Sequence, residues 1–192
     1  MPLAHAILGF LEYQPMTGYD LKKFFDLSIA HFWSATQSHI YKALETLEED
    51  GLVESTVIPG EGKPNRKQYQ VTDKGKAELQ RWMTTPLPLE PVREAWLIQI
   101  FFSHFSSNEE IALLFETRIN EIRERLQTLH TGAQAAIDEN AKQIGIERAR
   151  QLWQITLDFG IDYYEFELAW YEKTLATVRN LPPLTLPQSQ GQ

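Results

Sequence analysis

The sequence predicts a mainly helical protein in two parts, and three observations carry this prediction. Apolar residues recur at helical spacing along most of the 192 residues, and 43% of the chain is hydrophobic, which is enough for a packed core. Residues 52–72 change to the alternating period of a β-hairpin. A proline-rich stretch at 84–91 then precedes a second half that is helical throughout. We expect one domain over 1–86, an all-helical domain over 87–180 and a disordered tail over 181–192.

Three helices are predicted in the first domain. Apolar spacing over 3–11 indicates the first helix. Thr17 and Asp20, three positions apart, are typical of the capped start of a second helix. The third helix is expected to begin with Ser34 as its N-cap and Gln37 completing a capping box.

A hairpin and a fourth helix follow these three helices. Residues 52–58 and 67–72 are rich in β-branched and aromatic residues, and a polar turn over 59–66 joins them. Residues 73–83 return to helical spacing. This order of elements is that of a winged helix-turn-helix, whose third helix enters the DNA major groove while the hairpin, or wing, contacts the backbone. The predicted fold is therefore mainly α, with an N-terminal winged helix-turn-helix and an all-α second domain.

The charge distribution allows DNA binding only locally. A net charge of −8 argues against binding to polyanions, but residues 63–81 hold six basic and two acidic residues. Polar side chains that can donate to phosphates or base edges also lie outward near the start of the third helix. The residues expected to contact double-stranded DNA are Thr36, Gln37, Ser38, Tyr41, Lys42, Lys63, Asn65, Arg66 and Lys67.

Five segments resemble the PadR family of bacterial transcription regulators. In the first half they are AILGFLEYQPMTGYDL at 6–21, SATQSHIYKALETLEEDGLVES at 34–55 and GKPNRKQYQVTDKGKAELQRWM at 62–83. In the second half they are REAWLIQIFFSHF at 93–105 and LDFGIDYYEFELAWYEKTL at 157–175. The resemblance thus extends over nearly the whole chain.

The resemblance implies a homodimeric DNA-binding regulator with a helical C-terminal dimerisation domain. It implies that Tyr41 and the residues around it meet DNA, with Lys63, Arg66 and Lys67 as wing contacts. Lys42 stands where many members have proline, a substitution common in the subgroup with the longer C-terminal domain. Because occupying a promoter needs no further contacts, we expect a repressor.

The last predicted helix, over 147–179, has two nearly opposite apolar faces. One face carries Phe159, Tyr163, Phe166 and Trp170. Since a small domain can hardly cover both faces, we expect one to pack within the chain and the other against a second copy. The alternative is that neighbours in the same chain cover both. We assign the dimer contact to Leu157, Ile161, Tyr164, Leu168, Tyr171 and Leu175.

Aromatic residues of the second domain are candidates for an effector pocket, which we assign to Trp96, Tyr163 and Trp170. Some PadR-type regulators release DNA on binding phenolic or planar aromatic compounds, and the resemblance makes such an effector a candidate here. The alternative is that these rings are ordinary core residues, since aromatic stripes at helical spacing usually are.

Other function classes find little support in the sequence. The five histidines form no metal-ligand pattern and no paired carboxylates mark an active site, so we expect neither an enzyme nor a cofactor. No stretch is long and apolar enough for a membrane span. The absence of cysteine is compatible with the cytoplasm. The rival interpretation is a winged-helix module that binds proteins and not DNA.

Overall fold

The computed structural model describes residues 2–30, 32–59, 65–89, 91 and 93–184. Contacts divide the chain into two compact units, each with its own apolar core. The first unit comprises Met1–Pro88 and Ala136–Glu147, and the second comprises Leu89–Ala135 and Arg148–Gln192. Helical spacing alone does not indicate with which unit a segment packs, so the placement of Ala136–Glu147 had no signal in the sequence.

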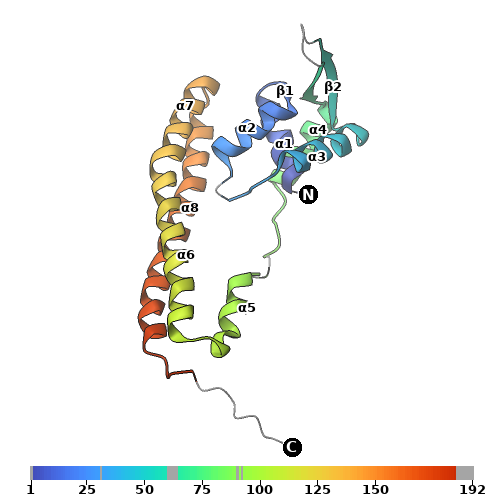
Figure 1. Ribbon diagram of the computed structural model, residues 1–192. Coiled ribbons are helices and arrows are strands. Elements are labelled where there is room, and N and C mark those ends of the chain that lie inside the picture. The colour runs from blue at the N-terminus through green and yellow to red at the C-terminus, as the bar shows by residue number, and fades with distance from the viewer. Residues whose placement is uncertain (1, 31, 60–64, 90, 92, 185–192) are drawn as a thin grey trace, which may run out of the picture. The chain divides into compact units, whose positions relative to one another are not determined.

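The first unit begins with three helices, α1 (Pro2–Tyr13), α2 (Gly18–Ser28) and α3 (Gln37–Glu49) (Figure 1). The predicted capping box of α2 is confirmed, because the Thr17 hydroxyl accepts from the Asp20 amide while the Asp20 carboxylate accepts from the Thr17 amide. The buried side chains of these helices form the centre of the first core. They include Ile7, Leu8, Leu11, Leu21, Phe25, Ile40, Leu44 and Leu47.

The start of α3 differs from the prediction. Its N-cap is Thr36 and not Ser34, since the Thr36 hydroxyl accepts from the His39 amide and Thr36 has the extended backbone of a cap. Both residues have the cap chemistry. The turns that follow α2, in which the Trp33 amide donates to the Ile29 carbonyl, keep Ser34 outside the helix.

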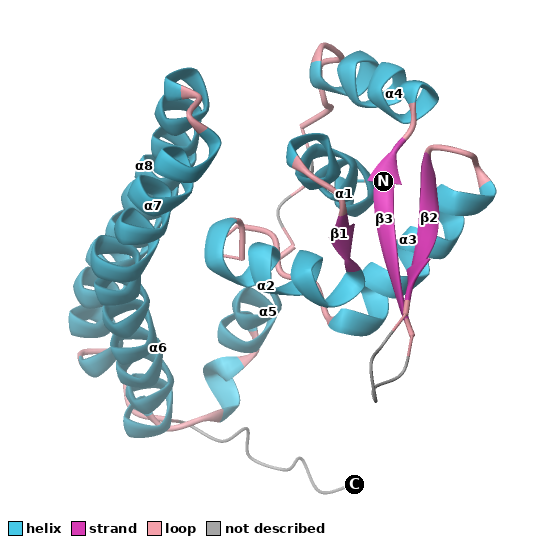
Figure 2. Ribbon diagram, turned by 90° about the horizontal axis from the view of Figure 1, so that it is seen from above, coloured by secondary structure: helices cyan, strands magenta, loops and turns pink. Residues whose placement is uncertain are grey.

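The hairpin is present and carries a short third strand. β2 (Val53–Ile58) and β3 (Arg66–Val71) pair antiparallel, and β1 (Met16–Thr17) pairs with the other edge of β3 (Figure 2). A two-residue strand has too few residues to show an alternating pattern, so β1 was not predicted. With the three helices this sheet completes a winged helix-turn-helix, and the predicted fold class is confirmed.

The fourth helix, α4 (Asp73–Met83), begins at the Thr72 N-cap and is tied to α1 through His5. The His5 imidazole lies 2.9 Å from a Glu78 carboxylate oxygen and stacks on Trp82 with ring centroids 4.6 Å apart. His5 is buried, whereas the sequence suggested a surface or boundary residue. A lone histidine near a chain end has no sequence signal for this partner, which lies 73 positions away.

Two long helices dominate the second unit. α6 (Asn108–Thr128) and α8 (Glu147–Arg179) run side by side (Figures 1 and 2). Ser107 and Glu110 form a capping box at the start of α6. The residues of α6 that bury against α8 include Phe115, Ile119, Ile122 and Leu126.

Shorter elements complete the helical part. α5 (Ala95–Phe101) is followed by a 3-10 turn (Ser103–Phe105), and a π-helical turn (Leu129–Ala133) leads from α6 into α7 (Gln134–Ile144). Gly145, with φ of 70°, ends α7 in a left-handed conformation that favours glycine.

Within the described ranges, none of the helices combines the length and apolarity needed to cross a bilayer. Of the tail that we expected to be disordered, residues 185–192 lie outside the described residues.

Gly75 allows α4 to approach the start of the wing. A Cβ at this position would lie 2.1 Å from the Leu52 carbonyl oxygen, so any side chain forces a backbone shift. We expect Gly75→Ala to lower the free energy of unfolding by about 1–3 kcal/mol, as overpacking does. Urea unfolding measures the loss. Gly9→Ala in α1 is the control, because a Cβ there meets nothing within 4 Å; equal stabilities of the two variants would contradict the steric argument.

Candidate nucleic-acid interface

The N-terminal half of α3 presents a polar outer face. Ile40, Ala43, Leu44 and Leu47 are buried on the opposite side, as helical spacing predicted. The five residues proposed here as DNA contacts are all exposed, and they supply hydroxyl, amide, phenol and ammonium groups. They are Thr36, Gln37, Ser38, Tyr41 and Lys42.

Tyr41 is held in place by a contact with the start of α2. A Cβ on Gly18 would lie 2.6 Å from Cε1 of Tyr41, so only glycine lets the ring lie against this backbone. Tyr19, the residue after Gly18, is 66% exposed, and His39 is exposed in the first turn of α3. Sequence reasoning assigned neither to the DNA contacts.

The wing divides its basic residues between two faces. Neighbouring residues of a strand point to opposite faces, so Lys67 shares a face with the buried Tyr69 while Arg66 lies on the other. Among the described residues, none forms an ion pair with Arg66. Asn65 is exposed, and Lys63 lies outside the described residues.

Lys67 is paired with an acidic residue of α3. Its Nζ lies 3.1 Å from Oε2 of Glu48, and the Ser55 hydroxyl of β2 donates to the other oxygen of that carboxylate. These two hydrogen bonds, that from Ser55 first, lower the pKa of Glu48, and the hydrogen bond to Glu48 raises the pKa of Lys67. The sequence predicted Lys67 as a DNA contact and assigned no role to Glu48. The structure joins the two.

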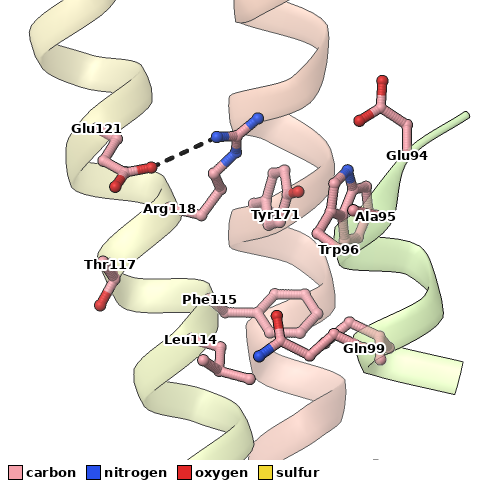
Figure 3. A pocket seen from close by; sticks show the side chains of 11 residues that line it. Glu94, Ala95, Trp96, Gln99, Leu114, Phe115, Thr117, Arg118, Glu121 and Tyr171 are labelled. Atoms are coloured by element: carbon pink, nitrogen blue, oxygen red, sulfur yellow. Dashed lines mark hydrogen bonds and ion pairs between the residues drawn. The ribbon is translucent and has the colours of Figure 1, made fainter. Parts of the chain in front are cut away.

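The second unit holds a pocket of about 400 Å³ lined by α5, α6 and α8 (Figure 3). Its polar residues include Trp96, Arg118 and Tyr171, and Arg118 also reaches Glu121 at 3.4 Å. The Trp96 Nε1, Arg118 Nε and Tyr171 hydroxyl are buried without a hydrogen-bond partner among the described residues. Burial raises the pKa of Tyr171 to about 12, so its hydroxyl remains a donor at neutral pH. The pocket therefore presents three unused donors beside aromatic rings.

The predicted effector residues meet only in part. Trp96 lines the pocket, and its ring packs edge-on against Trp170 with centroids 5.4 Å apart. Trp170 and Tyr163 do not line the pocket. Tyr171 and Arg118, which sequence reasoning did not assign to a ligand, line it instead. The sequence did not indicate this, because Arg118 of α6 and Tyr171 of α8 come together only when the two helices pack side by side.

The face of α8 assigned to the dimer contact is covered within the chain. Leu157, Tyr171 and Leu175 are buried, and Leu157 is 0% exposed. Ile161, Tyr164 and Leu168 are half-buried against the same core. The assignment of this face is thus corrected, because α6 and the segments around it already bury it. The opposite face remains open, with Phe159 65% and Phe166 69% exposed.

Two family models match the chain on either side of the proline-rich stretch. The Transcriptional regulator PadR-like family matches residues 7–81, and Virulence activator alpha C-term matches residues 92–179. The first half of the chain thus matches the PadR-like family, and the chain as a whole is similar to PadR regulators. The PadR-like part contains α3 and the wing, and the second match contains α6 and α8.

Individual relatives agree with this PadR-like assignment. The Mycobacterium tuberculosis protein named Probable transcriptional regulator Rv1176c is 40% identical over 114 residues, which are 59% of this chain and 57% of that protein. The Negative transcriptional regulator PadR of Bacillus subtilis is 28% identical over 178 residues, which are 92% of this chain and 97% of PadR.

Two crystal structures of Bacillus subtilis PadR are similar to this protein over nearly its whole length. The complex with operator DNA has a TM-score of 0.76 and 26% identity, covering 93% of this chain and 99% of that one. The complex with p-coumaric acid has a TM-score of 0.71 and 25% identity, with the same coverage.

Arg66 provides a test of the wing contact. We expect Arg66→Ala to weaken binding to every DNA sequence alike and to lower the slope of log affinity against log salt by about one. Fluorescence anisotropy over a salt series measures both quantities. Arg81→Ala is the control, since Arg81 pairs with Glu78 at 2.7 Å on α4. An unchanged slope in Arg66→Ala would show that the wing does not contact phosphate through this residue.

Proposed function

We propose that the chain is a homodimeric transcriptional repressor that binds a pseudo-palindromic operator through α3 and the wing. The observation that carries this proposal is the exposed polar N-terminal half of α3, together with an exposed Arg66 that forms no ion pair among the described residues, on a PadR-like fold. A repressor is favoured because a relative matching 92% of the chain is named a negative transcriptional regulator. Since a repressor must reach DNA, its place of action is the cytoplasm.

The proposed contacts have two roles: some read the base edges, and others position the protein on the phosphate backbone. Gln37 and Lys42 can reach base edges as hydrogen-bond donors, while Arg66 approaches the phosphate backbone. Glu45 and Glu49 are exposed in the C-terminal half of α3 and would repel phosphate. The helix therefore enters the major groove by its first two turns, the part that Tyr41 anchors on Gly18.

The open face of α8 is the proposed surface for a second copy. Its apolar residues follow spacings of three and four, which is the seam of a paired helix. The residues on this seam are Leu152, Ile155, Phe159, Tyr163, Phe166 and Trp170. A stripe of nineteen residues spans about 27 Å of helix, an extent of exposed apolar surface that monomers rarely carry. A second copy supplies a matching stripe through two-fold symmetry, and it places two α3 helices for two half-sites.

Phe166 tests the dimer surface. We expect Phe166→Glu to weaken self-association about 30-fold, because a charge replaces a central apolar contact of a kind that typically contributes about 2 kcal/mol. Size-exclusion chromatography with light scattering over a concentration series measures the change. Ala176→Glu is the control, since it adds the same charge to α8 in the exposed polar sector. A wild-type monomer, or an intact Phe166→Glu dimer, would exclude this surface.

A small aromatic compound is proposed to release the repressor from DNA. The supporting observations are the three unused donors of the α5–α6–α8 pocket and a relative whose structure holds p-coumaric acid. A carboxylate would accept from Tyr171 and Arg118, while the ligand ring would pack on Phe115 and Trp96. Glu121 would then lose its 3.4 Å contact with Arg118 and face solvent.

Binding to operator DNA is the direct test of the repressor. We expect the protein to bind DNA from upstream of its own gene at least about 1,000-fold more tightly than a scrambled duplex, the lower end for specific binding. Tyr41→Ala should reduce this ratio, since it removes a contact beside the bases. Fluorescence anisotropy measures both duplexes, and adding p-coumaric acid should release the operator. If the protein binds the two duplexes equally, and a genome-wide selection of DNA fragments finds no preferred sequence, the protein-interaction module is favoured. If p-coumaric acid leaves the operator affinity unchanged, this compound is excluded as the effector.

A further inference from the structure

Glu48 connects the recognition helix to the wing, and the proposed DNA contacts leave it without a function. It lies in the last turn of α3, within the stretch LEEDGL at 47–52 that carries part of the family resemblance. Its carboxylate accepts from Ser55 of β2 and from Lys67 of β3. One side chain therefore joins α3 to both strands of the wing.

The strand register explains why Lys67 and not Arg66 meets this carboxylate. Ser55 pairs with Tyr69 and Val57 pairs with Lys67, so all four side chains lie on the sheet face that carries the buried Tyr69. Arg66, one position earlier, points away from this face. Of these two adjacent cations of the wing, Lys67 pairs with a carboxylate, whereas Arg66 forms no ion pair among the described residues.

The surroundings of Lys67 are negative beyond this one contact. Glu45, one turn earlier on α3, also raises the pKa of Lys67, and the lowered pKa of Glu48 keeps that carboxylate ionised at neutral pH. A phosphate that binds Lys67 must also approach Glu48, whose Oε2 lies 3.1 Å from the Lys67 Nζ. The Glu48 carboxylate would then face the DNA backbone, and this like-charge contact opposes the gain from Lys67.

We propose that Glu48 is a specificity-determining residue that neutralises Lys67 and so withholds one phosphate contact from the wing. Phosphate contacts are independent of sequence, whereas base contacts near the start of α3 are not. Withholding a phosphate contact therefore weakens binding to arbitrary DNA more than it weakens binding to the operator, where α3 fixes the docked position. Specificity is the difference between these two affinities, and a repulsive element can enlarge it. The inference rests on the proposed DNA-binding function and reassigns Lys67 from a phosphate contact to the partner of Glu48.

Glu48→Gln removes the charge and keeps the shape of the side chain. The glutamine carbonyl oxygen can still accept from Lys67 while its amide NH2 donates to the Ser55 hydroxyl, so the wing stays attached to α3 while Lys67 regains its net charge. We expect affinity for a scrambled duplex to rise roughly five- to tenfold at about 0.1 M salt, and the salt slope to steepen by about 0.9, as one added phosphate contact requires. Affinity for the operator should rise less, so the ratio of the two affinities should fall.

Glu49→Gln is the matched control. Glu49 is the next residue, is exposed, and forms no ion pair among the described residues, so its substitution changes the net charge equally without releasing Lys67. The double variant Glu48→Gln with Lys67→Gln should return the slope to the wild-type value. Fluorescence anisotropy with the full-length protein on both duplexes over a salt series measures all four proteins, and thermal unfolding compares their stabilities.

Three results would overturn the proposal. The first is a Glu48→Gln slope equal to that of wild type, and the second is an equal steepening in Glu49→Gln, which would leave only a general charge effect. The third is a parallel loss of operator and scrambled binding with a lowered unfolding temperature, which would make Glu48 purely structural. Failure of the DNA-binding function itself is a different result, because the wild-type protein would then not distinguish the two duplexes.

Discussion

The burial of one side of α3 is the constraint on which the rest of the DNA-binding surface depends. Ile40 and Leu44 have no exposed surface, and Leu47 is 2% exposed, so each contributes about 1.5–3 kcal/mol that any rotation of the helix would lose. With this side fixed, the opposite side must face solvent. The contacts at the two ends of α3 then refine its position, because Tyr41 lies on the backbone of Gly18 and Glu48 binds the wing.

Local pairing explains how an acidic chain can carry a DNA-binding surface. The net charge of −8 describes the whole chain, but DNA meets only what α3 and the wing present. The wing contributes fewer effective charges than its composition suggests, since Lys67 is engaged by Glu48. An exposed pair of this kind adds little to stability, so its main consequence is electrostatic.

The two faces of α8 show where a helical pattern stops being informative. Both faces are apolar and both follow the spacing of a packed helix, so periodicity cannot say which one meets the chain's own α6. The structure packs Tyr171 and Leu175 against α6 and leaves Phe159 and Phe166 exposed. The same packing forms the pocket beside Trp96, because Tyr171 reaches it from α8 while Arg118 reaches it from α6.

The sequence by itself determined the elements that depend on neighbouring residues. The capping boxes at Thr17 and Ser107, the bounds of α4 and α8 and the alternating hairpin all arise from contacts within a few positions. Only the tertiary structure decided the contacts between distant residues. These are the pairing of β1 with β3, the contact of His5 with Glu78, the packing of Tyr41 on Gly18 and the pairing of Lys67 with Glu48. The tertiary structure also decided which residue caps α3. The physical reason is that spacing encodes which side of an element is apolar, whereas the partner of that side is set by packing among all the elements at once.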